Sequence, residues 1–398
     1  MRVFLAAFGD AGHVFPVTAL ACALRDRGHD VTVETYVRWQ PDIEREGLGF
    51  VAAAEFPPPD SGGRWFLPPF LAAEQATPVT REALRALQPD LVVSDILTIA
   101  PPLAAELEGI PVATLIPHVD PRPHRGHPPY SLGARLPRTA VGRAWWTLLD
   151  PLVRLGGRIG RDELNATRQN VGLPPLAHIH NGISARLAIV ATFPQLEYPR
   201  RMPEPNTHVV GPLQWEPQAD PVDLPRGDPS WPLVLVAPST AQDPDARLLR
   251  AAAAGLADLP IRLLITTNHR PPEGGLSLEA PNVRVVDWLS YAQTMPQADV
   301  VVCHGGHGTM TRALASGAVP VVWPAWGDMG ENAARLAWAG AGVRIPRRFL
   351  TAGTLRLAVL EALSDRRLHE RAGALRDWIA TNDPARTAAA LVEDAAHG

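Results

Sequence analysis

The chain has 398 residues, of which 46% are apolar and 20% charged, and its formal net charge is −4. This length suits two globular domains of roughly 150 to 200 residues each. Because there is no basic excess, the composition argues against a protein that holds nucleic acid or an anionic membrane surface. The sequence contains no lysine, which excludes a pyridoxal Schiff base, a Walker A phosphate loop and other lysine-dependent chemistry.

The two cysteines and thirteen histidines form neither a metal-binding nor a disulfide pattern. Cys22 and Cys303 lie in apolar segments, and no histidine pair has the HxxxH or HExxH spacing of common zinc sites. The apolar segment 3–8 is too short to cross a bilayer and does not resemble a signal peptide. We therefore expect a cytoplasmic protein with no metal ion, no nucleic-acid partner and no stable membrane insertion.

The first half of the chain alternates between short apolar runs and segments with helical periodicity. Strands are predicted at 2–8, 31–35, 91–94 and 112–116, and helices at 16–27 and 100–108. Strands separated by helices form parallel sheets with right-handed crossovers. Segments 56–70 and 117–137 are irregular and rich in proline, which is typical of active-site walls or mobile surface loops.

The second half repeats this alternation after a stretch rich in Pro, Asp and Gly at 211–232, which indicates a domain linker. Strands are predicted at 233–237, 261–266, 283–286, 300–303 and 319–323, and a helix at 246–257. We expect an α/β fold of two doubly wound, Rossmann-like domains that face a cleft, where ligands bind at the carboxyl ends of the strands. The predicted divisions are a first domain at 1–212, a linker at 213–231, a second domain at 232–375 and a helical tail at 376–398 that packs back on the first domain.

The most informative motif is the run His304-Gly305-Gly306-His307-Gly308-Thr309, which follows a predicted strand and enters helix-compatible sequence. Glycines allow a ligand to approach the backbone closely, and a helix N-terminus offers free N–H groups to an anion. His304 adds a donor that can become cationic. The run therefore predicts a diphosphate cradle, which Asp328 and Asn332 would complete through sugar or phosphate contacts.

Two polar residues of the first half follow predicted strands at one sheet edge. His13 ends the loop after the first strand and is either a general base or a helix-capping residue. Asp95 follows the strand at 91–94. A carboxylate in this position would fix the imidazole tautomer and raise its basicity, whereas the alternative is an N-cap for the next helix.

Three residues of the second half also lie at strand ends. Trp288 follows the strand at 283–286 and is either a platform for a nucleobase or a core tryptophan. Ser239 and Thr240 end the first strand of the second domain, where hydroxyl groups can meet a phosphate.

Together these motifs resemble the family 1 glycosyltransferases, which use nucleotide sugars and have the GT-B fold, and in particular their bacterial branch that glycosylates antibiotics. The matching positions are Gly9 to His13 followed by Pro16, Gly211-Pro212, Trp288, the run from His304 to Thr309, Gly317 to Pro320, and Asp328 to Asn332. The resemblance covers nearly the whole chain. It implies an inverting, metal-independent transfer in which His13 is the general base and Asp95 orients it.

The resemblance also assigns substrates to the two domains. The donor, a nucleotide sugar that acts as co-substrate in place of a cofactor, would contact Ser239, Thr240, Trp288, His304, Gly305, Gly306, His307, Gly308, Thr309, Asp328, Met329 and Asn332. The first domain would bind a hydrophobic natural-product aglycone such as a polyketide, in an apolar pocket for which the candidates are Trp65, Phe66, Phe70, Trp145 and Trp146. Family members commonly form homodimers.

Three departures from the family pattern bear on the donor. His307 stands where Ala or Ser is usual and either adds a phosphate donor or faces outward. Met329 replaces a Gln that bonds sugar hydroxyls in glucose-using relatives, which favours a deoxysugar. Arg312 replaces a Glu that binds the ribose in UDP-specific plant relatives, which favours dTDP. The alternatives are a UDP-hexose-dependent transferase of the same fold and a non-catalytic helper protein that binds a nucleotide sugar.

Overall fold

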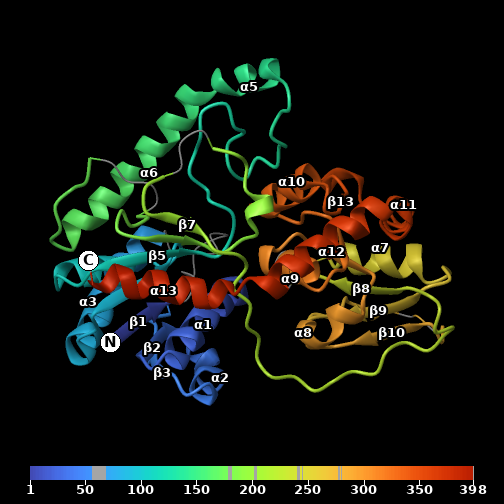
Figure 1. Ribbon diagram of the computed structural model, residues 1–398, viewed down its shortest axis with the longest axis horizontal. Coiled ribbons are helices and arrows are strands. Elements are labelled where there is room, and N and C mark those ends of the chain that lie inside the picture. The colour runs from blue at the N-terminus through green and yellow to red at the C-terminus, as the bar shows by residue number, and fades with distance from the viewer. Residues whose placement is uncertain are drawn as a thin grey trace.

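The computed structural model describes residues 1–55, 69–177, 182–200, 204–239, 243, 245–276, 278 and 280–397. Within these ranges the chain forms two parallel β-sheets of seven and six strands, with helices on both faces of each (Figure 1). This arrangement confirms the prediction of two doubly wound α/β domains.

The first sheet has the strand order β3-β2-β1-β4-β5-β6-β7, and all of its strand pairs are parallel. Its strands are β1 (Arg2–Ala6), β2 (Asp30–Thr35), β3 (Gly49–Ala52), β4 (Leu91–Asp95), β5 (Val112–Ile116), β6 (Ala188–Val190) and β7 (Thr207–Val209). The helices of this half are α1 (Ala11–Asp26), α2 (Gln40–Arg45), α3 (Pro69–Leu87), α4 (Ala100–Leu107), α5 (Ala140–Thr147) and α6 (Asp150–Asn170).

The second sheet has the order β10-β9-β8-β11-β12-β13 and is also parallel throughout. Its strands are β8 (Leu233–Ala237), β9 (Arg262–Thr266), β10 (Val283–Val286), β11 (Val300–Cys303), β12 (Val319–Val322) and β13 (Val343–Arg344). The helices that follow the linker are α7 (Arg247–Leu256), α8 (Tyr291–Thr294), α9 (His307–Ala315), α10 (Met329–Ala339), α11 (Ala352–Ser364), α12 (Arg366–Thr381) and α13 (Pro384–His397).

The strands that are easiest to recognise in the sequence are those whose residues are all buried. Every residue of β4, β8, β11 and β12 is buried, as expected for parallel strands covered on both faces, and such strands are continuous apolar runs. The outer strands β6, β7 and β13 have only two or three residues. Runs this short carry no recognisable pattern, and the sequence analysis did not predict them.

Each sheet has one point at which the strand order reverses. In the first sheet β1 lies beside β4, with Ala6 opposite Ser94. In the second, β8 lies beside β11, with Ala237 opposite Cys303. At such a point the connections on the two sides lead to opposite faces of the sheet, which leaves a crevice at the carboxyl ends of the strands.

The C-terminal helix α13 returns to the first domain and packs against α1 (Figure 1). Ala388, Ala389 and Val392 enter the core of that domain, and the Glu393 carboxylate pairs with Arg27 and His29. The linker begins at Gly211, whose φ is +111° and where a Cβ would lie 2.7 Å from Pro384. Glycine is therefore required where the linker passes under the tail.

The two domains also meet through a buried ion-pair cluster centred on Arg335 of α10. Its Nε lies 2.8 Å from Glu331 Oε1, and its Nη1 lies 2.9 Å from Glu197 Oε2 of the first domain. The guanidinium also lies 4.2 Å from the ring centroid of Tyr198. This cluster holds α10 against the chain that follows β6.

Cysteine pairing, metal ligands and membrane-spanning helices can each be checked across the described residues. Neither Cys22 nor Cys303 is in a disulfide. The described residues contain no group of three or more His, Cys, Asp or Glu side chains placed to hold a metal ion. None of their helices combines the length and apolarity needed to cross a membrane.

Replacing Arg335 by Ala should lower the free energy of unfolding by about 3–5 kcal/mol, because two buried carboxylates would lose their partner. Arg366→Ala is the matched control, since Arg366 forms an i,i+4 pair with Glu370 at the surface, where such pairs contribute little. Urea unfolding followed by tryptophan fluorescence compares the two variants. Equal effects would show that the Arg335 cluster is not a structural joint between the domains.

Candidate active site

The loop after β1 brings His13 onto the carboxylate of Asp95. Helix α1 begins at Ala11, so that His13 lies in its first turn and Pro16 lies inside the helix, whereas the sequence analysis placed the helix start at Pro16. The Nδ1–H of His13 donates to Asp95 Oδ1 over 2.8 Å. The other carboxylate oxygen accepts from the Thr98 hydroxyl at 3.2 Å.

Asp95 does not cap the following helix, because α4 begins at Ala100 and its N-cap residue is Ile99. The side chain of Asp95 is completely buried, whereas that of His13 is 17% exposed. With Nδ1 committed to the carboxylate, the Nε2 of His13 keeps a free lone pair. The structure thus places the two residues in hydrogen-bond contact, as the resemblance implies.

The electrostatics of the pair favour a basic imidazole. Burial by itself would lower the pKa of His13, but the charge and hydrogen bond of Asp95 outweigh it, and Asp10 and Asp328 add to their effect. The net result is a pKa above its usual value. Asp95, which is itself shielded from solvent, therefore increases the affinity of His13 for a proton.

A second histidine, His118, stands on the same sheet edge and was missed by the sequence analysis. It follows β5, its Nδ1 lies 2.7 Å from the Val119 carbonyl oxygen, and its ring stacks on Tyr130 at 5.6 Å. Burial lowers its pKa, and the charges of Asp328 and His13 both act on it. The available signal was its place directly after a predicted strand, which the irregular sequence of 117–137 obscured.

In the second domain, His304 bridges the point where β8 and β11 meet. Its Nδ1 lies 3.4 Å from the carbonyl oxygen of Ala237, the last residue of β8. A Cβ at Gly306 would lie 2.4 Å from His304 Nε2, so only glycine leaves room for this ring orientation. Burial lowers the pKa of His304 to about 4, so the imidazole is neutral near pH 7 until an anion approaches.

The glycine run then turns into helix α9. Gly305 has a φ of +90°, and a Cβ there would lie 3.1 Å from Met329, so this turn also requires glycine. Gly306 is the N-cap residue of α9, which starts at His307, and a Cβ at Gly308 would meet no atom within 4 Å. Thr309 completes the first turn. The helix N-terminus therefore has open space beside it, as an anion site requires.

Two buried side chains support this turn. Asn332 is fully buried, and its Nδ2 donates to the Gly305 carbonyl over 3.0 Å. His307 is only 8% exposed, so it does not face outward, and burial lowers its pKa to about 3. Neither ring nitrogen of His307 makes a hydrogen bond of ordinary geometry in the described part of the chain, but the Asn332 side chain and the Ala191 backbone both act on the ring as hydrogen-bond partners and raise its pKa. His307 is thus held inside the protein, between this turn and the chain that follows β6.

The charge of Asp328 acts on titratable residues of both domains. It is the N-cap residue of α10, but its carboxylate makes no capping hydrogen bond. Its charge raises the pKa values of His13 and His118 from one domain and of His304 from the other. The two switch points therefore face one region, with Asp328 between them and Met329 packed under Gly305.

Arg312 has a different environment from the one used in the sequence argument. Its guanidinium donates to the Trp215 carbonyl oxygen over 2.9 Å and lies 3.6 Å from Glu216 Oε2, and its side chain is 12% exposed. Glu216 also accepts hydrogen bonds from Ser290 and from the Ala292 amide. Arg312 thus fastens the linker to α9, and its presence carries no independent argument about the nucleotide.

Trp288 lies at the rim of the second domain in contact with His269. The two rings are parallel within 4° and their centroids are 5.1 Å apart. The indole is half-buried, so it is not a core tryptophan. Ser239 is buried at the end of β8, whereas Thr240 falls outside the described residues.

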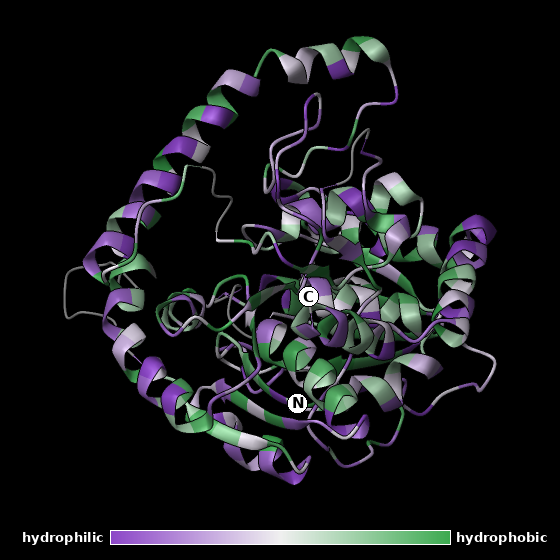
Figure 2. Cartoon of the chain, turned by 60° about the vertical axis from the view of Figure 1, so that its left-hand side comes forward, coloured by the Kyte–Doolittle hydropathy of each residue, from purple (hydrophilic) through white to green (hydrophobic). Residues whose placement is uncertain are grey.

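The candidates for the acceptor pocket are scattered. Trp65 and Phe66 lie outside the described residues, and Phe70 is half-buried at the start of α3. Trp145 and Trp146 lie on α5, which stands away from both sheets (Figures 1 and 2). Trp145 is 63% exposed, so no pocket encloses it here.

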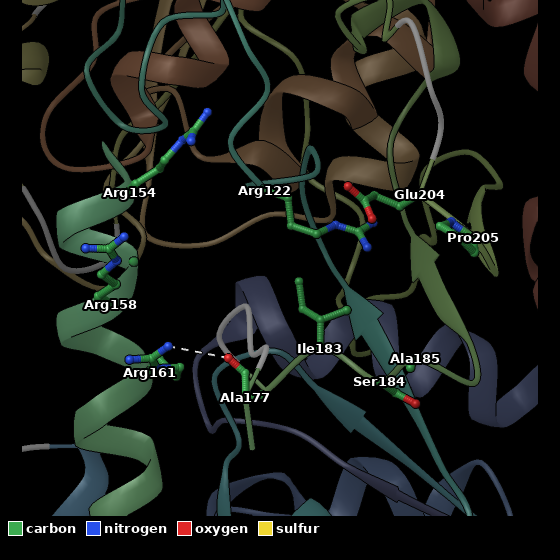
Figure 3. Close-up of a pocket in the computed structure, with 11 residues that line it drawn as sticks. Arg122, Arg154, Arg158, Arg161, Ala177, Ile183, Ser184, Ala185, Glu204 and Pro205 are labelled. Carbon is green, nitrogen blue, oxygen red and sulfur yellow. Dashed lines mark hydrogen bonds between the residues drawn. The ribbon is translucent and has the colours of Figure 1, made fainter. Parts of the chain in front are cut away.

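Two cavities lie between α6 and the first sheet. One, of about 320 Å³, is bordered by Asp95 and Thr98 and extends to Leu164 of α6. The other, of about 700 Å³, is shown in Figure 3 and has Arg122, Arg158 and Arg161 in its wall. Because the two share Ile183, Ser184 and Ala185, the space beneath α6 adjoins the Asp95 side of the site.

Comparison with known sequences gives a family match in the second half of the chain and relatives that match nearly its whole length. Residues 249–393 match the family described as erythromycin biosynthesis protein CIII-like, C-terminal domain. The chain is 30% identical to the 4'-demethylrebeccamycin synthase of Lentzea aerocolonigenes, over 98% of this chain and 99% of that protein. It is 28% identical to the O-mycaminosyltylonolide 6-deoxyallosyltransferase of Streptomyces fradiae, over 99% of this chain and 97% of that protein.

Two solved structures show the same architecture. The glycotransferase of kitacinnamycin matches with a TM-score of 0.77 and 22% identity, covering 99% of this chain and 98% of that one. The glycosyltransferase VinC, in complex with dTDP, matches with a TM-score of 0.73 and 22% identity, covering 100% of both chains. At this identity, the likeness establishes a shared fold.

Replacing Asp95 by Asn should lower the pKa of His13 below its ordinary value, because burial then dominates. NMR of the imidazole Cε1–H signal across pH measures this shift. Asp10→Asn is the matched control, because it removes a nearby charge but leaves the His13 hydrogen bond intact, and it should have a smaller effect. If the His13 pKa in Asp95→Asn equals that of the wild type, the buried carboxylate is not what makes the imidazole basic.

Proposed function

Since the chain belongs to the antibiotic glycosyltransferase family with the GT-B fold, we propose that it is an inverting transferase with His13 as its general base. The observation that carries this proposal is the hydrogen bond of His13 Nδ1 to the buried Asp95. This hydrogen bond leaves the Nε2 atom of His13 available. Asp328 acts electrostatically on both His13 and His304, so the sheet edge with His13 faces the glycine turn of the second domain. A base on one edge and an anion cradle on the other are the two groups that glycosyl transfer needs.

In the proposed reaction an acceptor hydroxyl lies against His13. Its proton passes to Nε2 as the oxygen forms a bond to the anomeric carbon of the donor sugar. The bond from that carbon to the diphosphate breaks on the opposite face, and the nucleoside diphosphate leaves with the electron pair. Attack opposite the leaving group inverts the anomeric centre. The charge of Asp95 stabilises the imidazolium that results.

The leaving diphosphate would be held by His304 and by the amides of the first turn of α9. The open space at Gly308 supports this placement. The positive end of the helix dipole adds to the stabilisation of the developing charge. In this proposal protein donors and the helix neutralise the leaving group, so transfer requires no metal ion. As the phosphates approach, their charge raises the pKa of His304 and favours its cationic form.

For the donor we propose a dTDP-deoxysugar. Met329 supports a deoxysugar, because it packs beside Gly305 and its thioether is a poor partner for a sugar hydroxyl. The complex of VinC with dTDP and the relative named as a 6-deoxyallosyltransferase support the same choice. Trp288, which is half-buried, would stack on the base. A UDP-hexose is the competing donor.

For the acceptor we propose a hydrophobic natural-product aglycone bound by the first domain. The relative that acts on O-mycaminosyltylonolide supports an acceptor of this class. The cavity bordered by Asp95, Leu164 and Ile183 offers apolar wall next to the base. Among the aromatic candidates that the structure describes, Phe70 is half-buried at the start of α3.

His13→Ala should lower the turnover number for transfer from a dTDP-sugar by ~10²–10⁴-fold, the usual contribution of a general base. Donor affinity should persist, since the cradle lies in the other domain. His29→Ala is the matched control, because His29 is also in the first domain and paired with a carboxylate, Glu393, away from the cleft. Transfer at the wild-type rate in His13→Ala would remove this residue from the mechanism.

Calorimetric titration should show tighter binding of dTDP than of UDP, and His304→Ala should weaken both. Arg312→Ala should leave the dTDP preference unchanged, because that guanidinium is occupied by Glu216 and the linker. Tighter binding of UDP would reverse the donor assignment. Binding of dTDP without transfer or hydrolysis of any donor sugar would instead support the non-catalytic helper.

A further inference from the structure

A stacked pair of rings at the carboxyl edge of the second sheet takes no direct part in the proposed transfer. His269 lies in the turn that follows β9, and Trp288 follows the neighbouring strand β10. The two rings are parallel within 4°, with their centroids 5.1 Å apart. Because the His269 side chain is 63% exposed, burial in a hydrophobic core does not account for this contact.

The backbone at His269 has a conformation that few residues with side chains adopt. Asn268 and His269 have φ values of +49° and +61°, and the Arg270 amide donates to the Thr267 carbonyl oxygen over 2.9 Å and closes the turn. Turns with two positive φ values favour asparagine at the first of these positions and glycine at the second. Histidine in place of glycine adds strain. The turn thus keeps an imidazole where a residue without a side chain would cost least.

Hydrogen bonds to Asp287 hold the imidazole in place. The Nδ1 of His269 lies 2.5 Å from Asp287 Oδ2, and the His269 backbone amide donates to the Asp287 carbonyl oxygen over 3.1 Å. The Thr267 hydroxyl donates to the other carboxylate oxygen over 2.7 Å. The bonds from Thr267 and His269 lower the pKa of Asp287, so its carboxylate is charged near pH 7. An imidazole restrained at its ring and at its backbone belongs to a fixed surface.

The same turn is tied to the strand end that supports the diphosphate cradle. The buried Asn268 donates through Nδ2 to the Pro238 carbonyl oxygen over 2.8 Å and to the Tyr291 hydroxyl over 2.9 Å. Pro238 directly follows Ala237, whose carbonyl oxygen lies 3.4 Å from His304 Nδ1. The stacked rings and the cradle therefore share the end of β8 as a common support, which sets their relative position.

We propose that His269 is a positioning residue of the nucleobase site, which backs the Trp288 indole and fixes the plane on which the base of the donor stacks. This inference rests on the proposed function, in which Trp288 contacts the base. In this site the indole lies between the imidazole and the base, in the parallel arrangement that aromatic rings favour. An indole that is already fixed loses little conformational entropy when the base arrives, and this strengthens binding.

Calorimetric titration of the full chain with dTDP and with inorganic pyrophosphate tests this role, because pyrophosphate lacks a base. His269→Asn removes the ring and introduces a residue that also tolerates positive φ. It should raise the dissociation constant of dTDP roughly threefold to tenfold, which corresponds to one aromatic contact, and leave that of pyrophosphate unchanged. In transfer assays the KM for the donor should rise by the same factor, whereas kcat should stay at the wild-type value.

Two further variants separate the stacked ring from a general effect on the domain. His269→Phe keeps a ring that can stack on Trp288 but loses the hydrogen bond to Asp287, and it should bind dTDP more tightly than His269→Asn does. His369→Ala is the matched control, because His369 lies on α12, which packs against α9 and β12, and it should bind dTDP as the wild type does.

The outcomes distinguish this inference from the proposed function. Trp288→Ala should weaken dTDP binding roughly tenfold or more. If it does and His269→Asn binds dTDP as the wild type does, this inference fails and the proposed base site stands. Tighter dTDP binding in His269→Asn would also overturn it, because the imidazole would then block the indole. So would equal losses of dTDP and pyrophosphate affinity. If Trp288→Ala leaves dTDP affinity unchanged, the base lies elsewhere, and the proposed role of Trp288 fails together with that of His269.

Discussion

The architecture depends on one constraint: a parallel sheet whose strand order reverses leaves a crevice at the carboxyl ends of its two central strands. This chain has two such points, at β1 beside β4 and at β8 beside β11. Each crevice holds a histidine fixed through Nδ1, by the Asp95 carboxylate in one domain and near the Ala237 carbonyl in the other. The fold thus presents two imidazoles with opposite electrostatics, one made basic by a buried anion and one made neutral by burial.

The contact between the two domains places these two histidines within the electrostatic influence of the same residue. Asp328 acts electrostatically on both histidines, and Arg335 joins α10, the helix that follows Asp328, to Glu197 of the first domain. Residues that position the candidate site are therefore also residues that hold the domains together.

Much of the fold was predictable because buried parallel strands are unbroken apolar runs, and the strands at 112–116, 233–237 and 300–303 have the predicted bounds. The edge strand at 283–286 also has the predicted bounds, although its middle residues are exposed. The glycine turn was predictable because its glycines are sterically required. Contacts between residues distant in the sequence were not predictable. Arg312, for example, lies close to Glu216 only because of the path that the linker takes. Trp145 was expected to line a pocket, yet its helix carries the apolar face outward, and the sequence does not show which way an amphipathic helix turns.

The central claim is that a buried carboxylate makes His13 the base for glycosyl transfer. The most direct test is the pH dependence of kcat/KM for transfer from a dTDP-sugar, measured for the wild type and for Asp95→Asn. The account predicts that activity falls on the acidic side as His13 takes up a proton, at a pH above the ordinary pKa of histidine, and that this limb moves to lower pH in Asp95→Asn. An acidic limb that stays in place when Asp95 loses its charge would contradict it.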